Sequence, residues 1–220
     1  MTRPATSDGK GNYPPRHKIE SFTVPNLLLV EGDDEYNFFR FLYPRDDVQI
    51  HVYNGKDHLK LDLQTIQGID GYDQIKRVAI VRDADRDPQA ALQSVLSQWA
   101  NALKEPLPQV VSDRWFDDSK GRQWSVWIMP DPETNGDLEE LLWRAVEASE
   151  HRSCVEELVI CLDTCDLVPF RSRTKARLYS WLSTQRDPVN ELHAAFKSKR
   201  GLFQQDHAAF SRFLTLVKEM

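Results

Sequence analysis

The sequence predicts an α/β fold in which a mainly parallel central sheet is flanked by helices and followed by a helical C-terminal part. Two short apolar runs, residues 26–30 (NLLLV) and 77–82 (RVAIVR), have the composition of strands buried on both faces of a parallel sheet. A helical pattern follows each run, and such alternation of strand and helix is typical of α/β proteins. The second half of the chain carries mostly helical patterns.

Strand and helix signals alternate along the first hundred residues. The first strand ends at a Glu-Gly pair, and the next helix opens with acidic residues and stops before Pro44. Residues 48–53 alternate apolar and polar side chains like a second strand, and residues 59–66 place leucine and isoleucine at helical spacing. After the third strand, Pro88 begins another helix, because proline is favoured at the first helical position.

Two further strands and several helices are expected beyond these elements. Residues 107–111 and 124–129 resemble strands, and the sequence DSKGR lies between them as a turn. Helical patterns occupy much of the remaining chain, at residues 138–149, 155–162, 174–183 and 208–218.

The length and composition indicate one domain with a tail. A chain of 220 residues, 40% of them hydrophobic, is long enough to bury a core, and no apolar run approaches the ~20 residues that cross a bilayer. We expect a flexible tail at residues 1–20, an α/β core at 21–148 and a helical extension packed on the same domain at 149–220. The chain starts without the apolar stretch of a secretory signal, which predicts a cytoplasmic protein without membrane contact.

The cysteines and tryptophans are interpreted as structural residues. The three cysteines form no CxxC pair and cannot all pair with one another, so we expect them to be reduced and in or near the core. The tryptophans could stack on unpaired bases, but core and rim positions are the more frequent use of such residues. These residues are Cys154, Cys161 and Cys165, and Trp99, Trp115, Trp124, Trp127, Trp143 and Trp181.

Acidic residues follow two of the predicted buried strands. Glu31 comes directly after the first, and Asp83 and Asp85 follow the third. In an extended backbone, residues two apart project to the same side, and ligands of open parallel sheets bind beyond the carboxyl ends of the strands. Since Mg²⁺ prefers carboxylate oxygens, water and phosphate as ligands, these three acids predict a Mg²⁺ or Mn²⁺ site.

A simpler interpretation exists for each of these motifs. A single acid after a strand is often a helix cap or a solvated turn residue, and Asp-x-Asp occurs by chance in acidic chains. The joint occurrence of both motifs after buried strands favours a functional site. Gly32 fits this interpretation, because it leaves the strand-to-helix turn unhindered and a helix N-terminus attracts anions such as phosphate.

The segment LLLVEGDDEYNFF, followed about fifty residues later by VAIVRDADRDP, resembles the Toprim domain of topoisomerases, bacterial primases, OLD-family nucleases and recombination proteins. The resemblance covers residues 26 to about 145 and is strongest to small stand-alone Toprim-like or OLD-nuclease-like proteins of unknown function. It implies a Rossmann-like sheet, a Glu in acid/base or metal chemistry and a DxD pair that binds Mg²⁺.

Several residues of this chain match that motif. Glu31 takes the place of the family's Glu and Gly32 that of its glycine, while Asp83 and Asp85 form the DxD pair. The resemblance therefore implies catalytic and metal-binding roles for the three acids. Glu35 departs from the pattern, because the family's EGxxD motif has Asp there, and the longer side chain leaves Glu35 without an assigned role.

Two later residues extend the resemblance. The segment GDLEELL resembles a Gly-x-Leu-Glu segment of the stand-alone and OLD-type relatives, which implies that Glu139 adds a ligand for a second metal. A surface acid at a helix start is the alternative interpretation. Lys175 resembles a catalytic basic residue that OLD-type nucleases place near the scissile phosphate.

The predicted function is Mg²⁺- or Mn²⁺-dependent phosphodiester chemistry, in a small nuclease that cleaves DNA or RNA. It would act alone, as a homo-oligomer or as the effector of a partner protein. The chain lacks a zinc ribbon, room for topoisomerase gates and the G-x-x-x-x-G-K-[ST] motif, which excludes primases, topoisomerases and ATP-driven OLD enzymes. The alternatives are a non-catalytic module that binds nucleic acid or nucleotide, and a purely structural interaction subunit.

The charge distribution contains one feature that opposes binding of nucleic acid and one that favours it. The 34 acidic and 28 basic side chains give a net charge of −6, which opposes general binding of nucleic acid. Two groups of basic residues favour it, although a solvated helix start also explains the first group. They are Arg171, Arg173, Lys175 and Arg177, and Lys197, Lys199 and Arg200.

Overall fold

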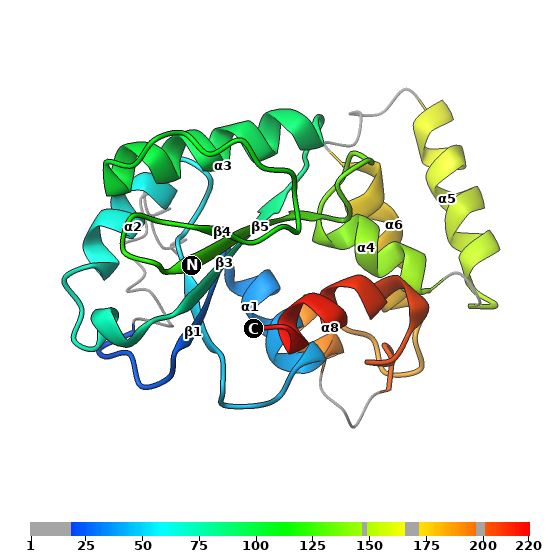
Figure 1. The fold of residues 1–220 in the computed structure, drawn as a ribbon. Coiled ribbons are helices and arrows are strands. Elements are labelled where there is room, and N and C mark those ends of the chain that lie inside the picture. Colours follow the sequence, from blue (N-terminus) through cyan, green and yellow to red (C-terminus); the bar gives the residue numbers. More distant parts are fainter. Residues whose placement is uncertain (1–18, 147–148, 166–171, 197–200) are drawn as a thin grey trace, which may run out of the picture.

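A five-stranded sheet forms the centre of the protein (Figure 1). The computed structural model describes residues 19–146, 149–165, 172–196 and 201–220. The strand order is β2-β1-β3-β5-β4, in which the first four strands are parallel and β4 runs antiparallel to β5. The strands are β1 (Asn26–Val30), β2 (Gln49–Val52), β3 (Arg77–Asp83), β4 (Phe116–Asp117) and β5 (Gln123–Met129).

Parallel pairing brings the ends of the three central strands to one edge of the sheet. Leu29 of β1 pairs with Ile80 of β3, and Ile80 pairs with Val126 of β5. The strands therefore end side by side, β1 at Val30 and β3 and β5 at the paired residues Asp83 and Met129. Loops that follow these strands open at the same edge, as expected for a site built on parallel strands.

The side chains of the sheet alternate between two hydrophobic cores. In β1, Leu27 and Leu29 belong to one core and Leu28 and Val30 to the other, and β3 and β5 alternate in the same way. Because both faces are covered by helices, β1 and β3 read as nearly continuous apolar runs rather than alternating ones.

Helices cover both faces of the sheet (Figure 1). Two of them, α2 (Leu59–Ile66) and α3 (Pro88–Leu103), pack on one face. The other face carries a larger core that includes the aromatic contacts of Phe38 with Phe196 and Phe210. Its helices are α1 (Asp33–Leu42), α4 (Leu138–Ala145), α6 (Arg173–Ser183), α7 (Leu192–Ala195) and α8 (Ser211–Lys218).

The remaining elements are short or peripheral. The helix α5 (Arg152–Thr164) packs against α6 at the edge of the molecule (Figure 1), and the 3-10 turns are η1 (Tyr72–Gln74) and η2 (Ala208–Phe210). Among the described residues, no helix is both long enough and apolar enough to span a membrane.

The predicted fold class is confirmed, and one predicted strand is wrong. The sheet is mainly parallel, helices flank it, and the C-terminal part is helical. Residues 107–111 form no strand, and Leu107 and Val111 are exposed. Pro106 and Pro108 explain the difference, since proline has no N–H to give to a ladder. The edge strand is β4 instead, and the turn at residues 118–122 joins it to β5.

The expected position of the cysteines is also wrong. All three are free, but they are exposed rather than in or near the core, Cys154 and Cys161 on α5 and Cys165 directly after it. The reason is the peripheral position of this helix, which buries only Val155 and Val159. Of the tryptophans, all but Trp115 are buried, and Trp115 packs partly buried against the larger core.

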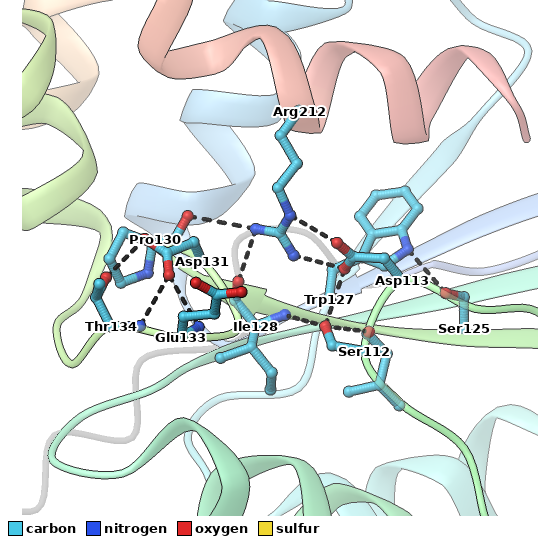
Figure 2. Close-up of polar contacts among 11 residues, drawn as sticks. Ser112, Asp113, Ser125, Trp127, Ile128, Pro130, Asp131, Glu133, Thr134 and Arg212 are labelled. Atoms are coloured by element: carbon cyan, nitrogen blue, oxygen red, sulfur yellow. Dashed lines mark hydrogen bonds and ion pairs between the residues drawn. The ribbon is translucent and has the colours of Figure 1, made fainter.

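An arginine of α8 fastens the end of β5 and the loop before β4 (Figure 2). Arg212 donates two hydrogen bonds to the carboxylate of Asp113, at 2.6 and 2.5 Å, and others to the carbonyl oxygens of Ile128 and Pro130. In the next loop, Asp131 accepts hydrogen bonds from two backbone N–H groups and from the Thr134 hydroxyl. These contacts fix the chain that leads from β5 to α4.

Replacement of Arg212 by methionine is expected to lower the free energy of unfolding by roughly 2–4 kcal/mol, because Asp113 and two carbonyl groups lose a charged donor together. Urea unfolding followed by circular dichroism measures the change. Arg40→Met is the matched control, since Arg40 pairs with the exposed Asp46 at 3.3 Å and such surface pairs contribute about 1 kcal/mol or less. Equal losses in both variants would contradict the role of Arg212.

Candidate carboxylate site

Acidic side chains from several elements gather at the carboxyl edge of the sheet. Asp83 lies at the end of β3, and the pKa of its carboxyl group is raised well above the usual range, first by burial and then by the charges of neighbouring acids. These neighbours come from the end of β1, from α1 and from the start of α4, and they are Glu31, Glu35, Asp137 and Glu139. We refer to these five residues as the carboxylate cluster.

Asp83 and Asp85 lie in different environments. The Oδ1 atom of Asp83 is buried and has no hydrogen-bond partner. The backbone is not extended at Asp85, where φ is +50°, so the geometry assumed for the DxD pair does not hold. Its side chain is 54% exposed, and its backbone exchanges two hydrogen bonds of 2.9 Å with Gly136. The structure therefore separates a buried carboxylate from an exposed one.

Arg82 supplies positive charge beneath the cluster. It is only 5% exposed, and its Nη1 donates to Oε2 of Glu31 at 3.0 Å. Its Nη2 lies 3.9 Å from Oδ2 of Asp85. The same oxygen accepts a hydrogen bond of 3.3 Å from Nζ of Lys56. Burial raises the pKa of Glu31, and the charge of Arg82 opposes that rise.

Gly32 gives Glu35 room to approach the backbone. Its φ of −147° suits any residue, but a Cβ at this position would lie 3.0 Å from Oε2 of Glu35. Burial is the largest cause that raises the pKa of Glu35, and the charges of Asp34, Glu31 and Glu139 raise it further. The resulting pKa is about 7. Glu35 thus belongs to the cluster, although the resemblance to the EGxxD motif assigns it no role.

Glu139 and Lys175 form an ion pair that joins α4 to α6. Nζ of Lys175 lies 2.9 Å from Oε1 of Glu139, whose side chain is buried. Burial lowers the pKa of Lys175, but the hydrogen bond and the charge of Glu139 outweigh burial and leave that pKa above its usual range. The sequence indicates both as candidate site residues, and the structure brings them together.

The other basic residues near Lys175 face elsewhere. Arg173 pairs with Asp163 at 2.7 Å and Arg177 pairs with Glu156 at 2.8 Å, so both bind acids of α5. They fasten one helix to another instead of lining an edge for phosphate. Four other basic residues singled out in the sequence lie outside the described residues, namely Arg171, Lys197, Lys199 and Arg200.

Asp137 is a member of the cluster that sequence reasoning missed. It caps the N-terminus of α4, where its side chain accepts the N–H of Glu140 at 3.1 Å. Burial and the charge of Glu139 raise its pKa. The preceding Gly136 has a φ of +138°, and a Cβ there would lie 2.9 Å from Cβ of Glu140. A Gly-Asp pair before a helix is the signal that identifies this cap.

The cluster does not form a ready metal site. Within the ranges that the structure describes, no group of three or more His, Cys, Asp or Glu side chains is placed so that it could hold an ion. Glu31 and Asp85 contact Arg82, and Glu139 contacts Lys175. The free buried oxygen of Asp83 and the crowding of acids nevertheless suit a divalent cation chemically.

An open cleft lies beside the cluster. Its volume is about 960 Å³, and its walls come from the loop after β2, the start of α3, the loop before α4 and the start of α6. Both signs of charge and several hydroxyl groups face it. Among its residues are Lys56, Asp85, Arg86, Asp137, Ser172 and Thr174.

Comparison with known proteins identifies a family. The model of the family described as "Protein of unknown function (DUF3226)" matches residues 25–220, so the chain belongs to that family. No curated protein matches the sequence.

Two similar solved structures are both of the C-terminal region of the OLD protein from Xanthomonas campestris pv. campestris. The one phased with iodine is 15% identical with a TM-score of 0.41, over 90% of this chain and 96% of that one. The one phased with platinum is 15% identical with a TM-score of 0.36, over 89% and 91% of the two chains. Likeness at this level defines no shared activity.

Glu35 is expected to make stability depend on pH. Its pKa rises from 4.5 to about 7 on folding, so the stability it contributes is full below about pH 4.5 and is lost as the pH rises to about 7. One such proton changes the free energy of unfolding by at most about 1.4 kcal/mol per pH unit. As the pH rises from about 5 to about 8, the free energy of unfolding of Glu35→Gln should therefore fall less than that of the unchanged chain.

Urea unfolding at several pH values measures this difference. Glu157→Gln serves as the control, because Glu157 is exposed on α5, away from the cluster. Parallel stability curves for the unchanged chain and for Glu35→Gln would refute the assignment.

Proposed function

We propose that this member of the DUF3226 family is a divalent-cation-dependent phosphodiesterase that cleaves nucleic acid at the carboxylate cluster. The observation that carries the proposal is the buried, unpartnered Oδ1 of Asp83 among four other acids. Buried polar atoms are nearly always hydrogen-bonded, and buried charges are usually paired or bound to metal. A cation at this position would supply the missing partner and relieve the repulsion between the acids.

The ligands of such a cation would be carboxylates of the cluster. Asp83 is free to bind, whereas Glu31 and Glu139 would have to exchange Arg82 and Lys175 for the ion. Asp85 is exposed at the rim and is a further candidate. The hard oxygen atoms of these side chains fit Mg²⁺ or Mn²⁺ better than softer metals.

The chemistry follows from the charges at this edge. A bound divalent cation offsets charge on a phosphodiester and makes water a better nucleophile. If Glu31 and Glu139 held the ion, Arg82 and Lys175 would have free N–H groups that could donate to phosphate oxygens. Glu35, with a pKa of about 7, can take or give a proton near neutral pH.

A non-catalytic module that binds nucleic acid or nucleotide is the second candidate. The observation that favours it is the set of ion pairs, since Arg82 and Lys175 already balance part of the acidic charge without a metal. Such a protein would bind its ligand in the cleft and release it unchanged.

Cleavage of labelled single-stranded and plasmid DNA, and of RNA, with Mg²⁺ or Mn²⁺ tests the proposal. We expect turnover by the unchanged chain and a loss of roughly 100-fold or more in Asp83→Asn and Glu31→Gln, as is usual when charge stabilisation at a reacting centre is removed. Asp73→Asn is the matched control, because Asp73 is exposed in η1, ahead of β3 and away from the carboxyl edge. Binding without turnover under either metal would favour the second candidate.

Thermal unfolding with and without Mn²⁺ tests cation binding separately. An ion present at 100 times its Kd adds about 2.7 kcal/mol to the free energy of unfolding, which raises the Tm by a few degrees. Asp83→Asn should lose this rise, and without metal it should be at least as stable as the unchanged chain, because a buried acid is removed. An unchanged rise in Asp83→Asn would exclude Asp83 as a ligand.

A further inference from the structure

Lys56 lines the cleft and lies close enough to the carboxylate cluster to act on its charges. It follows Gly55 in the loop after β2 and lines the cleft. Its charge and its backbone N–H both lower the pKa of Glu31, and its Nζ lies 3.3 Å from Oδ2 of Asp85. One lysine therefore acts on both an acid of the cluster and an acid at the cleft rim.

The backbone around Lys56 is held from two sides. The N–H of Gly55 donates to the carbonyl oxygen of Glu31 at 3.0 Å, and the carbonyl oxygen of Lys56 accepts from Nε2 of Gln98 at 3.1 Å. The left-handed conformations of Asn54 and Gly55, with φ of 59° and 101°, turn the loop toward these partners. Its position relative to β1 and α3 is thus fixed.

The side chain of Lys56, by contrast, is free to change partner. The side chains of Lys56 and Asp85 are 55% and 54% exposed, and an ion pair of this kind is weak in water. A phosphodiester carries the same single negative charge as a carboxylate, and its two non-bridging oxygen atoms accept hydrogen bonds in the same way, so it can replace Asp85 as the partner of Lys56. Lys56 is therefore an exposed, weakly paired cation on a held backbone, in the wall of the cleft.

Arg86 adds a second exposed cation along the same cleft, beside the buried Arg82. It is exposed one residue after Asp85 and lines the cleft wall with Lys56. The buried Arg82 also lines the cleft, and the other described lining residues are hydroxyl, amide and carboxylate groups, one glycine and three alanines, with no aromatic ring among them. Such a surface suits contacts to a sugar–phosphate chain better than stacking on bases.

We propose that the cleft holds the sugar–phosphate backbone of a nucleic acid strand, with Lys56 binding the phosphate next to the carboxylate cluster and Arg86 binding another. The inference rests on the proposed function, since it names how the substrate of that site is held. Lys56 acts on binding and orientation, because it delivers a phosphodiester to acids that would otherwise repel it.

The test measures binding apart from cleavage. A fluorescent single-stranded DNA is titrated with the protein in EDTA over a range of salt concentrations, and anisotropy gives the Kd. Each lost phosphate contact lowers the slope of log K against log salt by about 0.7 to 1. We expect this decrease and a several-fold higher Kd in Lys56→Met, a further decrease in Lys56→Met/Arg86→Met, and recovery in Lys56→Arg.

Lys60→Met is the matched control, because Lys60 is an exposed lysine four residues later that does not line the cleft. An unchanged salt slope in Lys56→Met, or no binding by the unchanged chain, would overturn the inference. Cleavage assays separate the two proposals. If Lys56→Met cleaves with an unchanged KM, the inference fails and the nuclease stands. If the unchanged chain binds through Lys56 but never cleaves, the nuclease fails and the inference stands.

Discussion

The ion pair between Arg82 and Glu31 is the interaction on which the acidic edge depends. Arg82 lies near the end of a central strand and is almost completely buried, so its charge acts on its surroundings with little screening by water. It pairs with Glu31, which directly follows β1, and lies close to the exposed Asp85. Without this guanidinium, the exposed Lys56 would be the remaining cation beside Glu31 and Asp85, and Glu31 would lose its buried partner.

Much of the fold is readable from the sequence, because buried parallel strands and amphipathic helices leave strong local patterns. The runs at β1 and β3 predict their strands, and the helical spacing near α5 and α6 predicts those helices. The edge of the sheet is less readable, since β4 has two residues and depends on its pairing with β5. The exposed position of the cysteines on α5 also follows from tertiary packing, which local sequence does not contain.

The candidate site was partly predictable for a similar reason. Parallel strands end together, so acids after β1 and β3 had to share an edge. The burial of Glu35 and Asp137 depends on how α1 and α4 pack on the sheet, and the pairing of Glu139 with Lys175 joins residues that lie far apart in the chain. The Toprim resemblance points to Glu31, Asp83 and Asp85 as site residues. The structure adds the cations that pair with Glu31 and Asp85.

The paired hydrogen bonds between Asp85 and Gly136 link two loops that come from different strands. One loop leaves β3 and the other leads into α4, and each contributes to the wall of the cleft. Neither loop can swing outward alone, because the movement would break both bonds or pull on a central strand. The separation of these two walls is consequently set by the sheet, and a ligand that enters the cleft meets, on this side, a frame that is continuous with the core.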